Sequence, residues 1–406
     1  MIKLYEQFGY NNTGFKDDVS EEHISMLKQN IEYRRRLNNK SEDCFYIHQS
    51  DKDSNRYHFK TSYFVGVDWI VENDLSIYVQ PKQNKGEIEI DCLKMLFDAL
   101  KEPQNFEHLD GLCEIDFNKP AIKIEQSQDL LSPFLIVQFL QILKTIVRKG
   151  LKKSYYPITR NLEARVKGKI LVNQTVKDNL VKNRLTKTVC RYDEFGVNCD
   201  ENRILKKAYL FSRRIIEQSR GINIGDLQSN INYIHPAFEN VSEDIRTDVI
   251  KNFKPNPLYK EYNRALKLAV LILKRYSYNI TQTSVAQKIE TPPFWIDMSK
   301  LFELYVFKKL REIFPKHGEV QYHFTSNYQE LDYLIKSNEH KIVVDAKYKP
   351  RYVDKNITKE DVRQVCGYAR MKKVYKELGI KDLNKVIDCL IIYPNQACNN
   401  DLSLDT

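Results

Sequence analysis

Glycine and proline are scarce in this sequence, with 13 of each in 406 residues, and no internal repeat or low-complexity tract stands out. Repeat architectures and flexible linkers therefore gain no support. At about 100–200 residues per domain the length suggests two or three domains. Their boundaries have to be inferred from changes in hydrophobic pattern.

Long apolar runs are also missing. The longest candidate, Leu266–Leu273, is interrupted by Lys267 and falls far short of the ~20 residues that cross a bilayer. The first residues lack the charged-then-apolar layout of a secretory signal. We therefore expect a cytoplasmic protein.

The eight cysteines include no C-x-x-C pair, and the eight histidines are scattered. This spacing gives no support to a zinc site, and single thiols fit a reducing compartment. No G-x-x-x-x-G-K-[ST] loop occurs, and Lys167-Gly168-Lys169 lacks its spacing. Any nucleotide-driven step would need another chain.

What the sequence does contain is enough apolar material for real cores, at 42%, and a net charge of +10. A basic excess suits a polyanionic partner, although it is a weak signal because the charge is spread out. Of the local basic clusters, only the one from Lys347 to Arg351 adjoins a candidate catalytic site.

Patterns along the chain predict an α+β multidomain protein. Residues 58–80 are typical of strands, a helix is expected at Ile90–Leu100 and a strand at Ala121–Glu125, so residues 1–125 form a β-rich N-terminal domain. Residues 126–290 are predicted to be a mainly helical middle region. Its expected helices follow Ser132-Pro133 and cover Glu201–Arg220 and Tyr259–Tyr276.

Residues 291–406 have a different order, αβββαβ, which predicts a compact mixed sheet flanked by helices. The expected elements are a helix, three strands, a second helix closed by Gly379, and a last strand, at Met298–Phe314, Val320–Thr325, Leu331–Lys336, Ile342–Lys347, Thr358–Leu378 and Val386–Tyr393.

Candidate chemistry lies where two of these strands meet. Asp345-Ala346-Lys347 ends an apolar strand, and the two-residue period places Asp345 and Lys347 on one face. Asp332 lies on the preceding strand. Two carboxylates on adjacent strands can share a Mg²⁺ ion, and a lysine beside them can hold water and offset phosphate charge. Taken alone, the Asp345–Lys347 pair is more typical of a surface salt bridge at a strand end, because an acid-x-Lys on a strand is common.

Two helix residues extend the set. Glu303 projects from an otherwise apolar helix face, and a buried carboxylate needs a partner such as a metal or a lysine. Gln364 shares a helix face with Tyr368 and Met371. The combination of these residues with the αβββαβ order predicts a nuclease.

At this point the sequence resembles the PD-(D/E)XK nuclease superfamily and, more narrowly, the McrC family of McrBC-type restriction systems. The strongest motifs are Leu301–Val306 and Val344–Lys349, with Gln364 before Gly367-Tyr368. Weaker likeness covers most of the chain beyond about residue 60, at Ile77–Lys82, Val166–Ile170, Cys190–Phe195 and Asn202–Lys206.

The resemblance implies an Mg²⁺- or Mn²⁺-dependent endonuclease that cuts DNA in a modification-dependent defence system. Its catalytic residues would be Asp332, Asp345, Lys347, Glu303 and Gln364, and its metal ligands Asp332, Asp345, Ala346 and Glu303. It also implies an AAA+ GTPase partner of the McrB type, which this chain would stimulate, docked on the N-terminal part of the chain. The family usually has proline before the first strand acid, where this chain has Leu331, so Glu330 remains an alternative to Asp332 as ligand.

Two other functions remain open. A stand-alone nuclease of the same superfamily, acting in DNA repair, would cut without nucleotide or partner. An inactive adaptor would only bind and activate an NTPase, although intact Asp345 and Lys347 argue against it.

Overall fold

The protein is described from a computed structural model over residues 1–9, 21–27, 30–37, 40–50, 53–81, 92–125, 131–218, 225–245, 260–279, 288–326, 329–349 and 359–394. Several predicted positions lie outside these residues: the helix ends at Ile90, Arg220, Tyr259 and Thr358, the end of the early motif at Lys82, and Arg351.

The chain divides into two compact units that do not follow its order. The first contains residues 1–134, 221–227 and 284–406, and the second contains residues 135–220 and 228–283. Both ends of the chain thus contribute to the first unit. The domain boundaries expected near residues 125 and 290 stay predictions.

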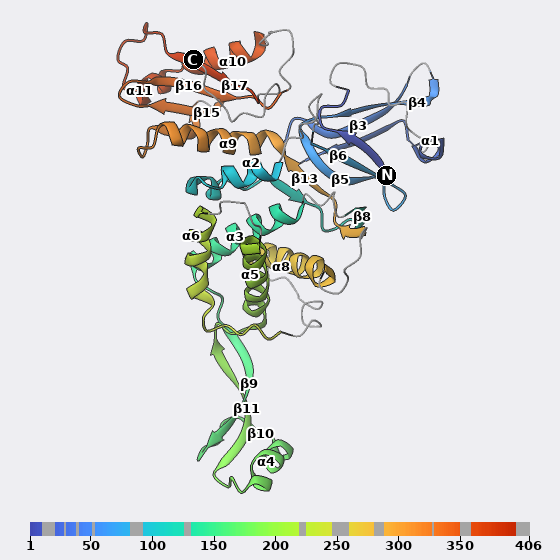
Figure 1. Ribbon diagram of the computed structural model, residues 1–406, viewed down its shortest axis with the longest axis vertical. Coiled ribbons are helices and arrows are strands. Elements are labelled where there is room, and N and C mark those ends of the chain that lie inside the picture. The colour runs from blue at the N-terminus through green and yellow to red at the C-terminus, as the bar shows by residue number, and fades with distance from the viewer. Residues whose placement is uncertain are drawn as a thin grey trace. The chain divides into compact units, whose positions relative to one another are not determined.

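A five-stranded sheet forms the N-terminal part of the first unit (Figure 1). Its order is β1-β6-β5-β13-β7, with β1 parallel to β6 and the other pairs antiparallel. The strands are Ile2–Tyr5 (β1), Leu75–Gln80 (β6), Phe64–Val71 (β5), Phe294–Asp297 (β13) and Cys113–Ile115 (β7). Since β13 comes from beyond residue 290, the C-terminal segment enters the N-terminal sheet before it builds its own.

Smaller elements surround this sheet. A three-stranded antiparallel sheet consists of Glu32–Arg36 (β2), Asp43–Ser50 (β3) and Asp53–Thr61 (β4), and its inner face joins one core with β1, β6 and Trp295. The others are Glu21–Leu27 (α1), Cys92–Ala99 (α2), Pro103–Glu107 (η1) and the pair Ile122–Glu125 (β8) with Lys288–Thr291 (β12).

A buried carboxylate fixes the position of β13. Asp68 on β5 is fully buried and accepts a hydrogen bond from the Trp295 indole Nε1 at 3.1 Å. Lys119 and Arg35 pair with the same carboxylate at 2.8 and 3.2 Å. Because an unpaired buried charge is costly, this arrangement strongly favours β13 between β5 and β7.

The C-terminal sheet has the order β14-β15-β16-β17, antiparallel except for the parallel β16–β17 pair. Helix Met298–Ile313 (α9) precedes it, and the strands are Val320–Ser326 (β14), Gln329–Lys336 (β15), Lys341–Ala346 (β16) and Asp388–Ile392 (β17). The predicted leading helix and four strands occur in the predicted order, and the second predicted helix is divided in two. Asp297 explains where α9 begins, since its carboxylate accepts the Lys300 N–H at 2.9 Å as an N-cap.

The second predicted helix of this region is interrupted. Helix Lys359–Ala369 (α10) ends, the chain turns through Arg370 and Met371, and Lys372–Glu377 (α11) follows. The break lets residues of α11 pack into the same core as Val365 and Tyr368 of α10. Gly379, at φ 65°, follows α11 as predicted.

The second unit combines helices with a long hairpin. Its helices are Leu131–Lys149 (α3, whose first four residues belong to the first unit), Asp200–Gln218 (α5), Gly225–Ile234 (α6, whose first three residues belong to the first unit) and Lys260–Asn279 (α8), with His235–Phe238 (η4) after α6. Ser132 lies inside α3 rather than capping it.

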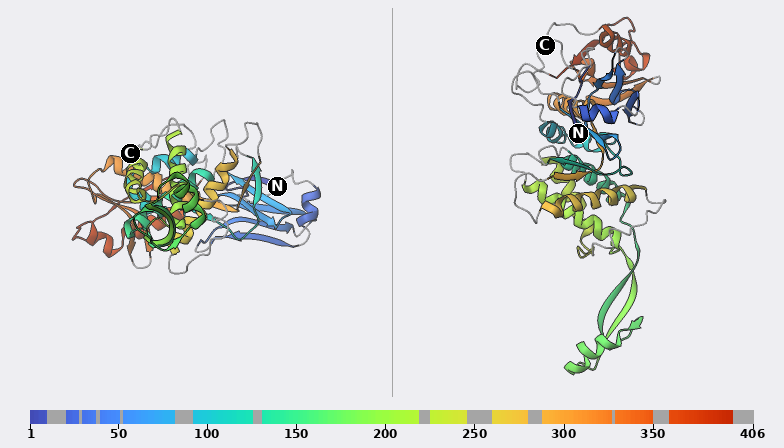
Figure 2. Two further views of the ribbon diagram at one scale, coloured as in Figure 1. Left: turned by 90° about the horizontal axis from the view of Figure 1, so that it is seen from below. Right: turned by 90° about the vertical axis from the view of Figure 1, so that its right-hand side faces the viewer.

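The hairpin was not predicted. Strands Ser154–Glu163 (β9) and Lys187–Gly196 (β11) pair over their full length, and Lys169–Ile170 (β10), Val172–Asp178 (α4) and Leu180–Lys182 (η3) form its tip. Figure 2 shows, in its right-hand view, the two strands leaving the helices of their unit. Most side chains on β9 are exposed or half-buried on both faces, so no buried face imposes an apolar alternation.

One helix among the described residues is long and apolar enough to cross a membrane. This is α3, and 72% of its apolar window is buried within the structure. The prediction that no segment approaches the length and apolar composition of a membrane span is therefore wrong for α3. A buried core helix meets the same criteria, so the finding is weak evidence for a membrane span.

Gly66 gives a test of how β13 is placed. A Cβ at Gly66 would lie 2.0 Å from the Phe294 carbonyl oxygen of β13. We expect Gly66→Ala to lower the free energy of unfolding by about 1–3 kcal/mol through overpacking. The control Gly367→Ala on α10 meets no atom within 4 Å and should be neutral or slightly stabilising. Equal urea midpoints for the two variants would contradict the placement.

Candidate functional site

The two strand acids lie opposite each other, Asp332 in the middle of β15 and Asp345 near the end of β16. Tyr333 pairs with Val344, so the same register continued by one residue puts Asp332 opposite Asp345. Asp332 Oδ2 accepts a hydrogen bond from the Ala346 N–H at 2.7 Å. The structure therefore brings together the acids that the sequence placed on adjacent strands.

Lys347 is the cation of this cluster. Its Nζ lies 2.8 Å from Asp345 Oδ2, and the Asp345 side chain is 1% exposed. Among the described residues this oxygen has an ion pair but no aligned hydrogen bond. Asp345 and Val343 lie on one face of β16, and Val343 packs in the core with α10 and α11.

Glu303 reaches the cluster from α9. Tyr322 Oη donates a long hydrogen bond to Glu303 Oε2 at 3.4 Å, and His323 Nε2 lies 3.4 Å from the same atom. The Tyr333 hydroxyl, on β15, donates to the Glu303 carbonyl oxygen at 2.6 Å. The helix turn that carries Glu303 is thus tied to the strand that carries Asp332.

Burial and neighbouring charges shift the pKa values of Asp332, Asp345 and Lys347. Burial, Glu303 and Asp345 raise the pKa of Asp332 to about 8, against the opposing effects of the Ala346 N–H and Lys347. Burial also raises the pKa of Asp345, despite Lys347. Burial lowers the pKa of Lys347, but Asp345 outweighs it and the net shift is upward. Lys347 therefore stays a cation at neutral pH.

These observations fit a hard divalent cation. Asp345 Oδ2 is buried beside Lys347, and the raised pKa of Asp332 reflects its burial and the nearby carboxylates of Glu303 and Asp345. Among the described residues no group of three or more His, Cys, Asp or Glu side chains is arranged to hold a metal. Mg²⁺ is commonly held by one or two carboxylates with substrate phosphate and water, which the Asp332–Asp345 pair can provide.

Two of the predicted or alternative residues lie apart. Gln364 is exposed, and its Nε2 donates to the Tyr368 hydroxyl at 2.7 Å. Glu330, the alternative strand ligand, is half-exposed and pairs through Oε1 with His323 Nδ1 at 2.7 Å. This placement favours Asp332 over Glu330.

Asp361, one turn before Gln364, was missed by sequence reasoning. It is buried, and its negative charge contributes to the raised pKa of both Asp345 and Lys347. Lys349 Nζ and the Tyr393 hydroxyl contact its two oxygens, each at 2.9 Å. A partial indication of Asp361 was present in the sequence, because its partner Lys349 lies only two residues after Lys347.

The chain after the lysine is anchored in the N-terminal sheet region. The Tyr348 hydroxyl donates to Glu6 Oε1 at 2.9 Å, with both side chains buried, and Gln7 Nε2 donates to the Tyr348 carbonyl at 3.2 Å. Residues after β1 thus hold the end of the candidate catalytic strand.

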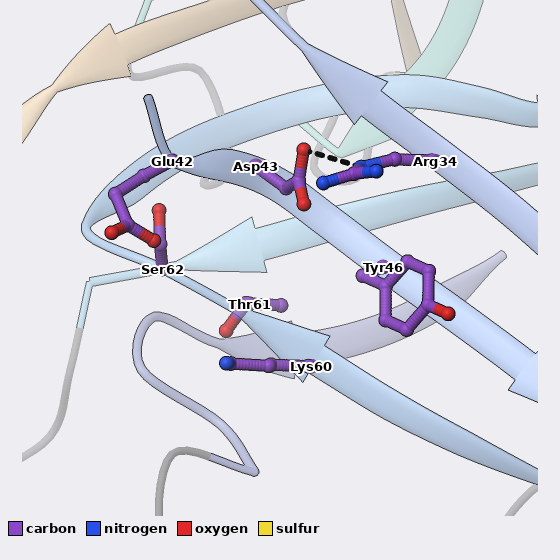
Figure 3. A pocket seen from close by; sticks show the side chains of 7 residues that line it. All are labelled: Arg34, Glu42, Asp43, Tyr46, Lys60, Thr61 and Ser62. Atoms are coloured by element: carbon purple, nitrogen blue, oxygen red, sulfur yellow. Dashed lines mark hydrogen bonds and ion pairs between the residues drawn. The ribbon is translucent and has the colours of Figure 1, made fainter. Parts of the chain in front are cut away.

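A separate polar pocket of about 300 Å³ lies at the three-stranded sheet (Figure 3). It is lined by Arg34, Glu42, Asp43, Tyr46, Lys60, Thr61 and Ser62. Arg34 Nε is paired with Asp43 at 2.8 Å. No lining residue belongs to the carboxylate cluster.

The upstream motifs have structural explanations. Asn202 is buried, donates to the carbonyls of Lys152 and Val197 at 2.9 and 2.7 Å, and accepts from the Tyr262 hydroxyl at 3.0 Å. At Gly168, with φ 67°, a Cβ would lie 2.5 Å from the Arg191 carbonyl oxygen. These residues fix the base and the tip of the hairpin.

The raised pKa of Asp332 predicts that the folding stability of the metal-free protein depends on pH. Between its ordinary value of 3.8 and about 8, the native state holds a proton that the unfolded state has lost, so stability falls as pH rises through this range. Asp332→Asn removes this effect. Urea unfolding in EDTA should show that this substitution raises the free energy of unfolding, by the smallest amount near pH 4 and by the largest above pH 8.

The exposed acid Asp74 provides the control. Asp74→Asn should change stability little at any pH. If the Asp332→Asn gain were the same at pH 4 and pH 8, the carboxylate repulsion would be refuted.

Comparison with known proteins gives the family. A sequence model of the McrBC 5-methylcytosine restriction system component matches residues 60–394, which is most of the chain. Curated proteins give no match. A half-complex of Thermococcus gammatolerans McrB AAA+ hexamers with bound McrC is 18% identical at a TM-score of 0.34, over 91% of this chain and 84% of that one. The cryo-EM structure of the Thermococcus gammatolerans McrBC complex is 17% identical at 0.29, over 78% and 89%.

TM-scores this low do not establish a shared fold, so the assignment depends on the family match. That match extends from β4 to the residues after β17 and includes every member of the carboxylate cluster. The chain belongs to the family of McrBC 5-methylcytosine restriction system components.

Proposed function

We propose that this chain is the DNA-cutting subunit of its restriction system, a PD-(D/E)XK endonuclease that hydrolyses phosphodiester bonds with Mg²⁺ or Mn²⁺. The observation that carries the proposal is the cluster of Asp332, Asp345, Lys347 and Glu303, which come from β15, the end of β16 and the leading helix. Family membership supports it, because a restriction system requires a component that cuts DNA.

The roles follow from charge and position. Asp332, Asp345, the Ala346 carbonyl and Glu303 would hold the metal, which when bound supplies Lewis-acid polarisation of the scissile phosphate. Lys347 is a cation at neutral pH, so it acts as a hydrogen-bond donor and countercharge for phosphate and water, and not as a base. Gln364, on the exposed face of α10, would contact DNA or water from the side of the site.

Cleavage in plasmid DNA tests the roles of the site residues. Asp345→Asn and Lys347→Ala should each reduce cutting roughly 10²–10³-fold or more, because each removes charge that acts on the reacting phosphate. Asp388→Asn, an exposed acid on β17, is the control and should cut like the wild type. Near-normal cutting by Lys347→Ala would remove the lysine from the mechanism.

We further propose that cutting needs an AAA+ GTPase partner, which this chain stimulates. The chain contains no phosphate-binding loop of its own, and a family defined by a multi-component system supports a partner. Plasmid cutting only with both GTP and the neighbouring gene's product, on methylated DNA, would support this function. Cutting by the chain alone would favour a stand-alone nuclease, and no cutting in any mixture would favour an inactive adaptor.

The hairpin tip is a second candidate for partner contact, beside the docking expected in residues 1–125. Within residues 164–187 seven large aliphatic side chains are 42–76% exposed: Val166, Ile170, Val172, Val176, Leu180, Val181 and Leu185. The same stretch has seven basic residues and one acid, namely Arg165, Lys167, Lys169, Lys177, Lys182, Arg184 and Lys187 against Asp178. Contiguous exposed apolar surface marks protein contacts.

Substitution at the tip tests this contact. Val181→Asp with Leu185→Asp, at 76% and 74% exposed positions, should abolish co-elution with the partner while urea stability stays unchanged. Val386→Asp, also 76% exposed, is the matched control and should leave binding intact. Normal co-elution of the double variant would exclude the tip as a partner contact.

A further inference from the structure

His323 has an unusual backbone for a residue in the middle of a strand. Its φ is 55°, in the left-handed region, where a side chain with a Cβ is strained. Its neighbours pair normally, Tyr322 with Tyr333 and Phe324 with Leu331, and the same register places His323 opposite Asp332. The irregularity thus occurs directly across from a candidate metal ligand.

The turn between the strands does not require this conformation. The β14–β15 connection lies between Ser326 and Gln329, and regular pairs at Phe324, Thr325 and Ser326 separate it from His323. Strained backbone persists where surrounding contacts hold it, and it concentrates at functional sites.

The side chain of His323 joins two carboxylates. Nδ1 lies 2.7 Å from Glu330 Oε1, which is a close ion-pair distance. Nε2 lies 3.4 Å from Glu303 Oε2, the oxygen that Tyr322 Oη also contacts. Glu330 therefore anchors the ring, and the opposite ring nitrogen faces Glu303.

Glu303 needs such a restraint. Its carboxylate adds to the negative charge that raises the pKa of both Asp332 and Asp345. Before a cation binds, repulsion from these two acids favours rotamers that carry Glu303 away from them. A contact that holds Glu303 toward the strands reduces the cost of bringing three carboxylates to one ion.

We propose that His323 is a positioning residue that holds Glu303 in place for metal binding, with Glu330 as its anchor. This rests on the proposed function, since it assigns Glu303 to the metal site. The strained backbone of β14 at His323 is the conformation that directs the ring between Glu303 and Glu330. Residues that hydrogen-bond to metal ligands commonly affect metal affinity about 10–100-fold.

His323→Gly separates this role from a structural one. Glycine accepts a positive φ, so the urea unfolding midpoint of the metal-free chain should be unchanged or higher. Without the ring, the affinity for Mn²⁺ alone, measured by calorimetric titration of the full chain, should fall roughly 10–100-fold. His323→Asn, which tolerates the left-handed region and retains a donor, should retain intermediate affinity and provides the test if the glycine variant unfolds.

Asn183→Gly is the matched control, because Asn183 has φ 56° at the hairpin tip. It should leave Mn²⁺ affinity unchanged. Asp345→Asn reports on the proposed function separately and should abolish the same binding. If His323→Gly and His323→Asn both bind Mn²⁺ like the wild type while Asp345→Asn does not, the role of His323 is refuted and the nuclease proposal stands. If Asp345→Asn also binds Mn²⁺ normally, the role of His323 and the nuclease proposal are both refuted.

Discussion

The ion pair between Asp345 and Lys347 is the interaction on which the candidate site depends. Asp345 is almost fully buried, and Asp332, Glu303 and Asp361 add further negative charge around it. Lys347 pairs with Asp345 and Lys349 with Asp361, so two lysines face four acids and the cluster has more acidic than basic side chains. Burial, together with the charges of Glu303 and Asp345, raises the pKa of Asp332, and the excess of acids is the physical reason why a divalent cation suits the site.

Support for this cluster comes from both ends of the chain. The strand β13 lies inside the N-terminal sheet and leads directly into α9, which carries Glu303. Buried Asn105, after α2, donates to the Leu304 carbonyl at 2.7 Å, and Tyr348 bonds Glu6. These contacts connect the N-terminal sheet directly to the leading helix and to the end of β16, so a conformational change in the sheet would affect both.

The sequence predicted the parts whose pattern is local. The αβββαβ order followed from apolar periodicity, and Asp332, Asp345, Lys347 and Glu303 followed from their places on those elements. It missed what depends on distant partners: the hairpin with two exposed faces, the membership of β13 in the N-terminal sheet, the break after Ala369, and the approach of Asp361. The positive φ of His323 also had no local signal, because histidine is ordinary in a strand sequence and its partners Glu303 and Glu330 lie on other elements.

The most direct test of the central claim is a crystal structure of the full chain soaked in Mn²⁺, with anomalous diffraction to locate the ion. We expect an anomalous peak bonded to carboxylate oxygens of Asp332 and Asp345, at distances of about 2.0–2.3 Å that suit a hard divalent ion. Lys347 should shift from Asp345 Oδ2 as the ion takes that oxygen. Mn²⁺ bound elsewhere, with the Asp345–Lys347 pair unchanged, would show that Asp332 and Asp345 do not form the metal site.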